Sequence, residues 1–435
     1  MKNLTIKSKI LFISLCSLII LGVVLAIISV TQSRSILEEN AYKRLETITL
    51  IKQHQLETFF QEVTEDITIL SRNLSIHTLV EALIEIHPEL NLKEKDDFPI
   101  NNQLVKDTIS KYEDSLLSFS KESGYKDILI IGSDSGRVVY STKDNSDYGA
   151  NLIYGKLKDS ALARVWKKAI ELKRPVFEDM SLYLPTGNNP EMFIGTPIYI
   201  KDRIEAILVF RFDEVSINEI ITFRKGFGES EETLLLGPDS LLRSDSILLP
   251  KVYNLKKALE NPETNKITTS YVKDGLSGGS GFGEIKAFSG DIIMKYYAPI
   301  KVGQDFKWVI ISKIDKKEVL ITPNRIRNII IIASLLLIAI VGISMYIFVN
   351  SMVVKPLNVF QNGLLSFFKY LNKETEDTQE LIVDRKDEIG LMSSIVNENI
   401  NKIKKGLEEE KKLIDNASEI INTVNTGVLT DRILL

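Results

Sequence analysis

Two uncharged apolar stretches constrain this 435-residue chain more than any other feature. Residues 10–30 and 328–349 contain no Asp, Glu, Lys or Arg. An α-helix rises about 1.5 Å per residue, so each stretch is long enough to cross a hydrocarbon core of about 30 Å. The first is too long for a typical signal peptide and no A-x-A cleavage site follows it. We therefore predict two transmembrane helices; the alternatives are a cleaved signal peptide for the first and a buried soluble helix for the second.

The basic residues around these stretches set the expected orientation. Lys2, Lys7 and Lys9 precede the first stretch, and a long loop is translocated largely regardless of its charges. We therefore expect residues 1–9 and the segment from residue 350 onward, both termini included, in the cytoplasm. Residues 31–327 are expected on the opposite side of the membrane.

The composition excludes several functional classes. A single cysteine, Cys16, rules out a disulfide framework within one chain and a cysteine-based zinc site. The net charge of −4 argues against a generally basic nucleic-acid binder. All three histidines precede residue 88, so no cytoplasmic histidine is available as a phospho-acceptor, and the Gly-rich run at 278–283 falls between strands outside the cytoplasm. We expect no enzyme activity, metal, cofactor or nucleic-acid partner.

The segment between the two stretches contains a long helix and an internal repeat. Apolar residues recur at helical spacing over 35–86, whereas short β-rich runs follow residue 125. Residues 130–135 resemble 235–240, and residues 196–213 resemble 298–315. The pattern predicts an α+β fold with two tandem modules, at 125–225 and 226–318. Asp213 and Asp315 are expected to cap the helices that follow them.

A long helix followed by two PAS-like modules between membrane spans resembles the double Cache sensor family. Residues 125–140 and 177–197 resemble the first strands and the pocket-side strands of its distal module. The resemblance implies a small-molecule pocket lined by Tyr140, Asp179, Tyr183, Phe193 and Tyr199, with Asp179 pairing with an amine or hydroxyl. The nearest match to the family's amino-acid motif, residues 164–167, lacks its second aromatic residue. Carboxylates, other metabolites and the absence of any direct ligand therefore stay open.

The segment after the second stretch resembles a HAMP domain. Pro356 and Leu357 begin one amphipathic helix, and the sequence Asp387-Glu388-Ile389-Gly390 opens another after a polar connector. The resemblance implies a HAMP domain over 350–407, with the start of a second HAMP-like helix over 408–435. Pairing of two chains would bury the apolar stripes in a four-helix bundle, so we expect a homodimer. The residues named in this paragraph are the expected signal-coupling residues.

The order of these segments resembles the input half of a methyl-accepting chemotaxis protein without its C-terminal signalling hairpin. This resemblance implies a multi-pass protein of the bacterial inner (cell) membrane, with its sensor periplasmic or extracellular. Partners would be membrane lipid, a small ligand and, if a downstream signalling domain exists, a chemotaxis kinase or adaptor. One alternative is the sensor half of a transmembrane histidine kinase or nucleotide cyclase. Another is a binding protein that modulates a full-length receptor through mixed dimers.

Overall fold

The computed structural model describes residues 6–287, 290–375 and 377–425. Its contacts define two compact units: Gln32–Asn324 forms one, and the described residues before and after it form the other. The strands are β1 (Asp127–Gly132), β2 (Val138–Ser141), β3 (Val176–Tyr183), β4 (Asn189–Ile200), β5 (Arg203–Asp213), β6 (Glu232–Leu236), β7 (Gly281–Lys286), β8 (Ile292–Val302) and β9 (Phe306–Asp315). The α-helices are α1 (Ile6–Ser71), α2 (Leu74–Ile86), α3 (Gln103–Ile109), α4 (Glu113–Ser123), α5 (Ala161–Leu172), α6 (Val215–Thr222), α7 (Leu255–Glu260), α8 (Pro262–Asn265), α9 (Ser270–Ser277), α10 (Lys316–Val319), α11 (Ile321–Val349), α12 (Lys355–Leu371) and α13 (Glu388–Asn425).

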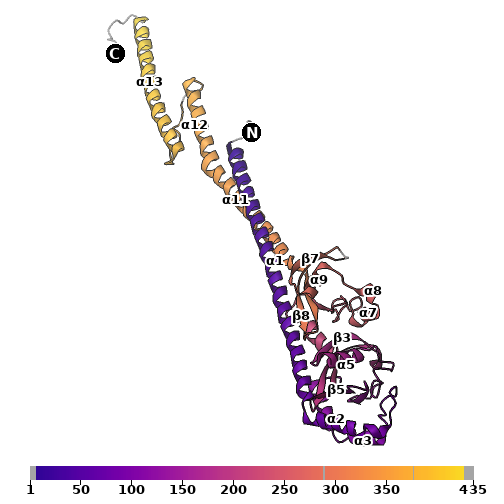
Figure 1. The fold of residues 1–435 in the computed structure, drawn as a ribbon. Coiled ribbons are helices and arrows are strands. Elements are labelled where there is room, and N and C mark those ends of the chain that lie inside the picture. Colours follow the sequence, from indigo (N-terminus) through magenta and orange to yellow (C-terminus); the bar gives the residue numbers. More distant parts are fainter. Residues whose placement is uncertain (1–5, 288–289, 376, 426–435) are drawn as a thin grey trace. The chain divides into compact units, whose positions relative to one another are not determined.

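The unit Gln32–Asn324 contains two antiparallel sheets that lie along α1 (Figure 1). The first sheet has the order β2-β1-β5-β4-β3 and the second the order β6-β9-β8-β7. We call them, with the helices on their outer faces, the first module (β1–β5 with α5) and the second module (β6–β9 with α7–α9). The mixed α and β composition, the antiparallel sheets and the long N-terminal helix confirm the coarse fold class expected from the sequence.

Side-chain alternation divides the first sheet between two apolar cores. Ile128 and Ile130 of β1 pack in the same core as the α1 residues Phe60 and Val63. Leu129 and Ile131 point the other way, into a core that α5 completes. Successive side chains of a strand face opposite sides of its sheet, so this sequence of apolar residues is buried on both faces.

The internal repeat is present in the strand register. Thr196 of β4 lies opposite Leu208 of β5, and Ala298 of β8 lies opposite Ile310 of β9, each pair 102 residues from its equivalent. The two hairpins therefore pair in the same way in both modules.

The two aspartates expected to cap the helices after these hairpins differ in their hydrogen bonds. The Asp213 carboxylate accepts a hydrogen bond from the Val215 amide, whereas the Asp315 side chain makes no capping hydrogen bond to α10.

The helix expected over 35–86 consists of two helices in the structure. α1 ends at Ser71, and Asn73 adopts an extended conformation whose side chain accepts a hydrogen bond from the Ser75 amide. Asparagine is a strong N-cap because its side-chain oxygen satisfies a backbone N–H that lacks a helical partner. The cap restarts the helix, so the expectation of one uninterrupted helix was wrong at this point.

Two helical runs, Ser8–Ser71 and Lys316–Leu371, are long and apolar enough to cross a membrane by length and composition. They contain the two stretches from which the spans were predicted, and apolar side chains such as Ile20 and Leu336 are exposed there. After α11, a π-helical turn at Asn350–Val354 leads into α12.

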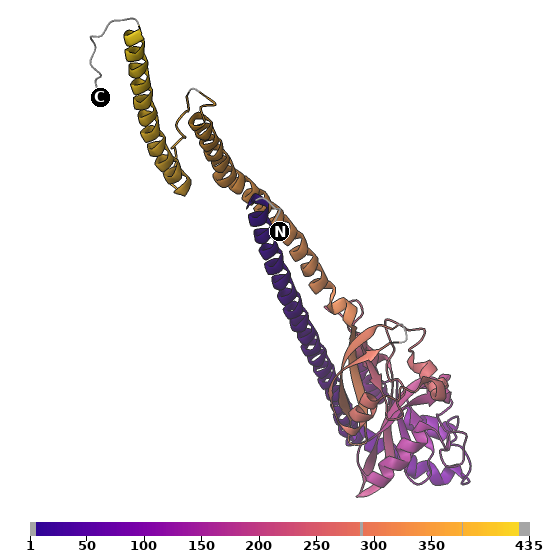
Figure 2. The ribbon, with the colours of Figure 1, turned by 90° about the horizontal axis from the view of Figure 1, so that it is seen from above.

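Helices α12 and α13 lie side by side and run in the same direction, because the connector between them returns along α12 (Figure 2). Phe367 of α12, Leu381 of the connector and Ile400 of α13 form a small apolar core. The expected boundary between the HAMP domain, ending at residue 407, and the second HAMP-like helix, beginning at residue 408, falls inside α13, which continues to Asn425. Residues 426–435, the last part of the expected second HAMP-like helix, lie outside the described residues.

Candidate ligand-binding site

A buried group of charged and polar residues lies at one end of the first sheet, on the face that α5 partly covers. Its members come from the start of β1, the end of β2, the following loop, the end of β3, the start of β4 and the end of β5. We call this group the distal cluster; it consists of Asp127, Ser141, Asp147, Tyr183, Glu191 and Arg211, all 8% exposed or less. These strand residues share a face with Leu129 and Val209, which belong to the core on the α5 side.

Arg211 is the one cation of the distal cluster. Its Nη2 atom lies 3.3 Å from Oδ2 of Asp127, and its Nη1 atom lies 3.6 Å from Oε1 of Glu191. Ser141 donates a hydrogen bond of 2.9 Å to the Asp127 carboxylate. Strand pairing places Asp127 directly opposite Arg211, so this ion pair is built into the register of β1 and β5.

The second part of the distal cluster joins the loop after β2 to the end of β3. The Tyr183 hydroxyl donates a hydrogen bond of 2.8 Å to Oδ2 of Asp147. Its ring packs edge-on against Phe193, with a centroid distance of 4.9 Å. Burial, together with the negative charge of Asp147, raises the pKa of Tyr183 above its usual range, so Tyr183 stays a neutral donor.

The distal cluster has more negative than positive groups. Arg211 pairs with Asp127 and Glu191, and Asp147 adds a third carboxylate. Burial raises the pKa of Asp127 to about 6 and that of Glu191 to about 7, against the opposing effect of Arg211. Within the described residues, Oδ1 of Asp147, Oε2 of Glu191 and Nε of Arg211 make no hydrogen bond. A buried polar atom without a partner is costly, so the two carboxylate oxygens favour a ligand that brings a positive charge and hydrogen-bond donors, and Nε of Arg211 favours one that also brings an acceptor.

The described residues contain no group of three or more His, Cys, Asp or Glu side chains arranged to hold a metal ion.

The five residues expected to line a pocket do not form one site. Tyr183 lies in the distal cluster and Phe193 packs against it. Tyr140 lies on the opposite face of the sheet, in the core that faces α1. Tyr199 is 42% exposed and lines a separate cleft with residues such as Lys173.

Asp179 connects the two modules. Its carboxylate accepts hydrogen bonds of 3.0 and 2.6 Å from Nε and Nη2 of Arg243, and one of 3.0 Å from the Trp308 indole. Arg243 is 1% exposed. The pairing expected between Asp179 and a ligand amine is thus replaced by an internal bidentate pairing with a guanidinium.

Sequence reasoning missed the four charged residues of the distal cluster. The signal was present, since Asp127, Glu191 and Arg211 stand at the ends of otherwise apolar strands. Charges at strand ends are usually solvated, and only the fold shows that these residues are buried, as is Asp147 of the loop after β2.

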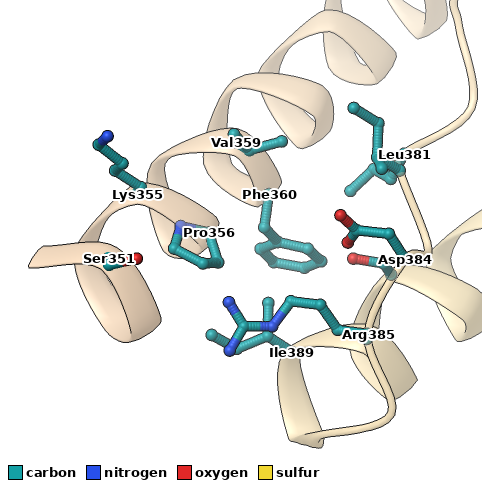
Figure 3. Close-up of a pocket in the computed structure, with 12 residues that line it drawn as sticks. Ser351, Lys355, Pro356, Val359, Phe360, Leu381, Asp384, Arg385 and Ile389 are labelled. Carbon is teal, nitrogen blue, oxygen red and sulfur yellow. The ribbon is translucent and has the colours of Figure 1, made fainter. Parts of the chain in front are cut away.

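Three of the six expected signal-coupling residues, Pro356, Ile389 and Gly390, lie together between α12 and α13. They border a hollow of about 290 Å³ whose lining includes Pro356, Phe360, Leu381, Arg385 and Ile389 (Figure 3). Leu357, also expected there, is one of the exposed apolar residues of α12, and Glu388 is exposed at the first position of α13.

Asp387 holds the start of α13 in place. Its Oδ1 atom accepts a hydrogen bond of 3.1 Å from the Gly390 amide, and this bond lowers the pKa of Asp387. Arg385 pairs with the same carboxylate and also donates to the Met352 carbonyl oxygen. The expected helix-opening sequence therefore also connects α13 to the turn before α12.

Asn397 fixes the connector against α13. Its side-chain amide donates to the Leu381 carbonyl oxygen and accepts from the Leu381 amide, both at 2.7 Å. One buried side chain thereby satisfies both backbone groups of a connector residue, as an extended strand would.

Comparisons with known proteins give similarities of fold only. No model of a known protein family matches the chain, and no curated protein matches it. The ligand-binding domain of the Pseudomonas fluorescens chemoreceptor CtaA, in complex with L-isoleucine, is 13% identical at a TM-score of 0.43, covering 66% of this chain and 97% of that one. The ligand-binding domain of the Campylobacter jejuni chemoreceptor Tlp3, in complex with L-valine, is 12% identical at a TM-score of 0.43, with the same coverage. At these values the matches assign neither a family nor a ligand.

Proposed function

We propose that this chain is the input half of a transmembrane chemoreceptor of the double Cache and HAMP type. The observation that carries the proposal is the distal cluster, in which three buried carboxylates accompany one guanidinium and two carboxylate oxygens make no hydrogen bond among the described residues. The sensor would lie outside the cytoplasm, in the periplasm or beyond the cell membrane, and both ends of the chain would lie inside.

The proposed ligand is a small molecule with a protonated amine. An ammonium group placed beside Oδ1 of Asp147 and Oε2 of Glu191 would supply donors to two acceptors that lack them. Charge-assisted hydrogen bonds of this kind are roughly twice as strong as neutral ones. Arg211 would keep Asp127 ionised and oriented rather than contact the amine.

The proposed relay uses the exposed apolar surfaces of the other unit. Side chains such as Ile20 and Leu336 would contact lipid, and the pair of α12 and α13 would complete a four-helix bundle with a second copy. Ligand binding would shift the population of alternative bundle packings, for which a coupling of about 1–3 kcal/mol is typical.

Calorimetric titration of the full chain in detergent tests the ligand class. We expect binding from a panel of L-amino acids, ethanolamine and putrescine, and none from glucose. Asp147→Asn should weaken binding of any hit at least tenfold, because it removes the charge that the ammonium contacts. Asp134→Asn, at an exposed turn of the same module, is the matched control. An affinity unchanged in Asp147→Asn would overturn the assignment of the site.

A further inference from the structure

A cleft of about 230 Å³ lies in the unit Gln32–Asn324, where α1 and α5 end and the last residues of β4 approach them. Its lining includes Arg72, which follows α1, and the consecutive residues Lys173 and Arg174, which follow α5. None of the described residues that line it is Asp or Glu. We call this hollow the basic cleft. Since a water molecule takes about 30 Å³ of liquid volume, the cleft has room for a small anion and several waters.

Two of these three cations have no counter-charge within the chain. In the part of the chain that the structure describes, the side chains of Arg72 and Lys173 form no ion pair and no hydrogen bond. Arg174 differs, because its Nη2 atom lies 2.7 Å from Oδ1 of Asp305, on the turn between β8 and β9. Two positive charges therefore face the same cleft, and one doubly charged anion would balance them.

The helix ends at the basic cleft change this balance little. A cation is favourable after the C-termini of α1 and α5, whereas the N-terminus of α2, on the same side, favours an anion. Each helix end is equivalent to about half an elementary charge. Two C-termini and one N-terminus thus leave most of the charge of Arg72 and Lys173 uncompensated.

The backbone at Lys173 shows that its side chain is not needed to end α5. Lys173 adopts the left-handed conformation, with φ at 53°, where glycine is the usual residue and a side chain is unfavourable. Its backbone N–H donates to the Ala169 carbonyl oxygen, a hydrogen bond that glycine would make equally well. The lysine therefore brings a charge to the cleft at a position that local structure assigns to glycine.

The donors around the basic cleft come from three directions. Besides Arg72 after α1 and Lys173 after α5, Tyr199 of β4 lines the cleft, and its hydroxyl makes no hydrogen bond within the described residues. A tetrahedral oxyanion presents acceptor oxygens on every side, whereas the two oxygens of a carboxylate lie in one plane. Donors arranged in this way suit a phosphate group better than a carboxylate.

From these observations we propose that the basic cleft is a second ligand site, for inorganic phosphate or the phosphate group of a small phosphomonoester. Arg72 and Lys173 would donate charge-assisted hydrogen bonds to the phosphate oxygens, and the Tyr199 hydroxyl would add a neutral one. Arg174 would stay paired with Asp305 and hold the segment before β3 in place.

This site is separate from the amine site proposed for the distal cluster. Thr196 of β4 lines the basic cleft, whereas Glu191, at the start of the same strand, belongs to the distal cluster. The two residues lie about 17 Å apart along the strand, and their side chains face opposite sides of the sheet. Binding at one site therefore does not require the other.

Equilibrium dialysis of the full chain in detergent against radiolabelled inorganic phosphate tests the proposal. We expect saturable binding of one phosphate per chain, with competition by sodium sulfate and none by sodium succinate at equal ionic strength. Lys173→Gly should weaken binding about tenfold, because it removes a charge-assisted hydrogen bond. Arg72→Gln should have a similar effect. Lys167→Gln, at an exposed lysine within α5, is the matched control and should bind phosphate as the wild type does.

The variants keep the test interpretable. Glycine adopts the left-handed conformation without strain, so Lys173→Gly should fold, and Arg72 is exposed. Asp147→Asn should bind phosphate with unchanged affinity, which distinguishes failure of this site from failure of the amine site. Absence of saturable binding, unchanged affinity in Arg72→Gln and Lys173→Gly, or equal competition by succinate and sulfate would each overturn the proposal.

Discussion

Asp179 was expected to pair with a ligand amine or hydroxyl, but in the structure its carboxylate pairs within the protein. It joins β3 of the first module to Arg243 and Trp308 of the second. Without Asp179, the buried Arg243 would keep only the more exposed Asp239 as a partner, so the loss should be smaller than the cost of a fully uncompensated buried charge, about 3–5 kcal/mol. We expect Asp179→Ala to lower the melting temperature of the full chain accordingly. It should leave the affinity of the remaining folded protein for an amine unchanged.

The matched control for Asp179 is Asp239, which also pairs with Arg243, at 2.9 Å, but has a side chain that is 42% exposed. Exposed ion pairs contribute about 0–1 kcal/mol, so Asp239→Ala should have a much smaller effect on the melting temperature. Equal losses in the two variants would contradict the role given to Asp179.

Glu191 makes the stability of the first module depend on pH in an unusual direction. Burial raises its pKa from 4.5 to about 7. The folded state therefore holds the proton more tightly than the unfolded chain. The proton on Glu191 thus stabilises the folded state; this contribution is complete below pH 4.5 and is lost as the pH rises through about 7.

We expect the melting temperature of the wild type to fall relative to that of Glu191→Gln between pH 5 and pH 8. The exposed Glu219→Gln variant should give a curve parallel to the wild type. A constant difference between the wild type and Glu191→Gln across this range would show that Glu191 does not titrate there.

At the scale of elements, helix α13 contains two glycines that should respond oppositely to alanine. A Cβ atom at Gly390 would lie 2.1 Å from the Arg385 carbonyl oxygen, whereas one at Gly406 meets nothing within 4 Å. Gly390→Ala should loosen the first turn of α13. Gly406→Ala should stabilise the helix by about 0.5–1 kcal/mol, because alanine has the higher helix propensity. Amide hydrogen exchange around residues 388–391 and 402–410 measures both effects, and equal protection in the two variants would contradict this explanation.

The sequence predicted some elements well and others poorly for identifiable reasons. The paired hairpins could be predicted from the sequence because Pro197 and Pro299 occupy equivalent positions in the repeat, and each is followed by a strand and then by a polar turn. The break at Asn73 was hidden because the apolar periodicity continues across it into α2. The continuity of α13 across the expected domain boundary agrees with the charged run at 408–412, which consists of good helix formers and contains no stop signal.

The candidate site was harder to predict than the fold. Tyr183 and Phe193 were expected near the ligand because residues 177–197 resemble the pocket-side strands of a double Cache module. Asp147, by contrast, comes from an irregular loop whose path no local pattern specifies. Which face of a sheet a loop covers is a long-range property, so the distal cluster became visible only in three dimensions.

At the scale of the whole molecule, the proposed four-helix bundle requires two copies of the chain. Met392 belongs to the apolar stripe of α13 and is 47% exposed in the single chain, and a second copy would cover it. In a Cys16→Ser background, Met392→Cys should form a disulfide between two chains on mild oxidation. Glu398→Cys, on the charged face where Glu398 pairs with Lys402, should not. Non-reducing electrophoresis distinguishes these outcomes, and equal cross-linking at both positions would contradict a defined bundle.

The most direct test of the central claim joins the sensor to the α12 and α13 pair in one experiment. The Met392→Cys chain is placed in lipid nanodiscs, and the rate of disulfide formation is measured with and without the amine identified by titration. Binding at the distal cluster should change this rate at least threefold, and Asp147→Asn should abolish the change. A rate that stays the same while the amine is bound would contradict the claim that this chain relays ligand binding across the membrane.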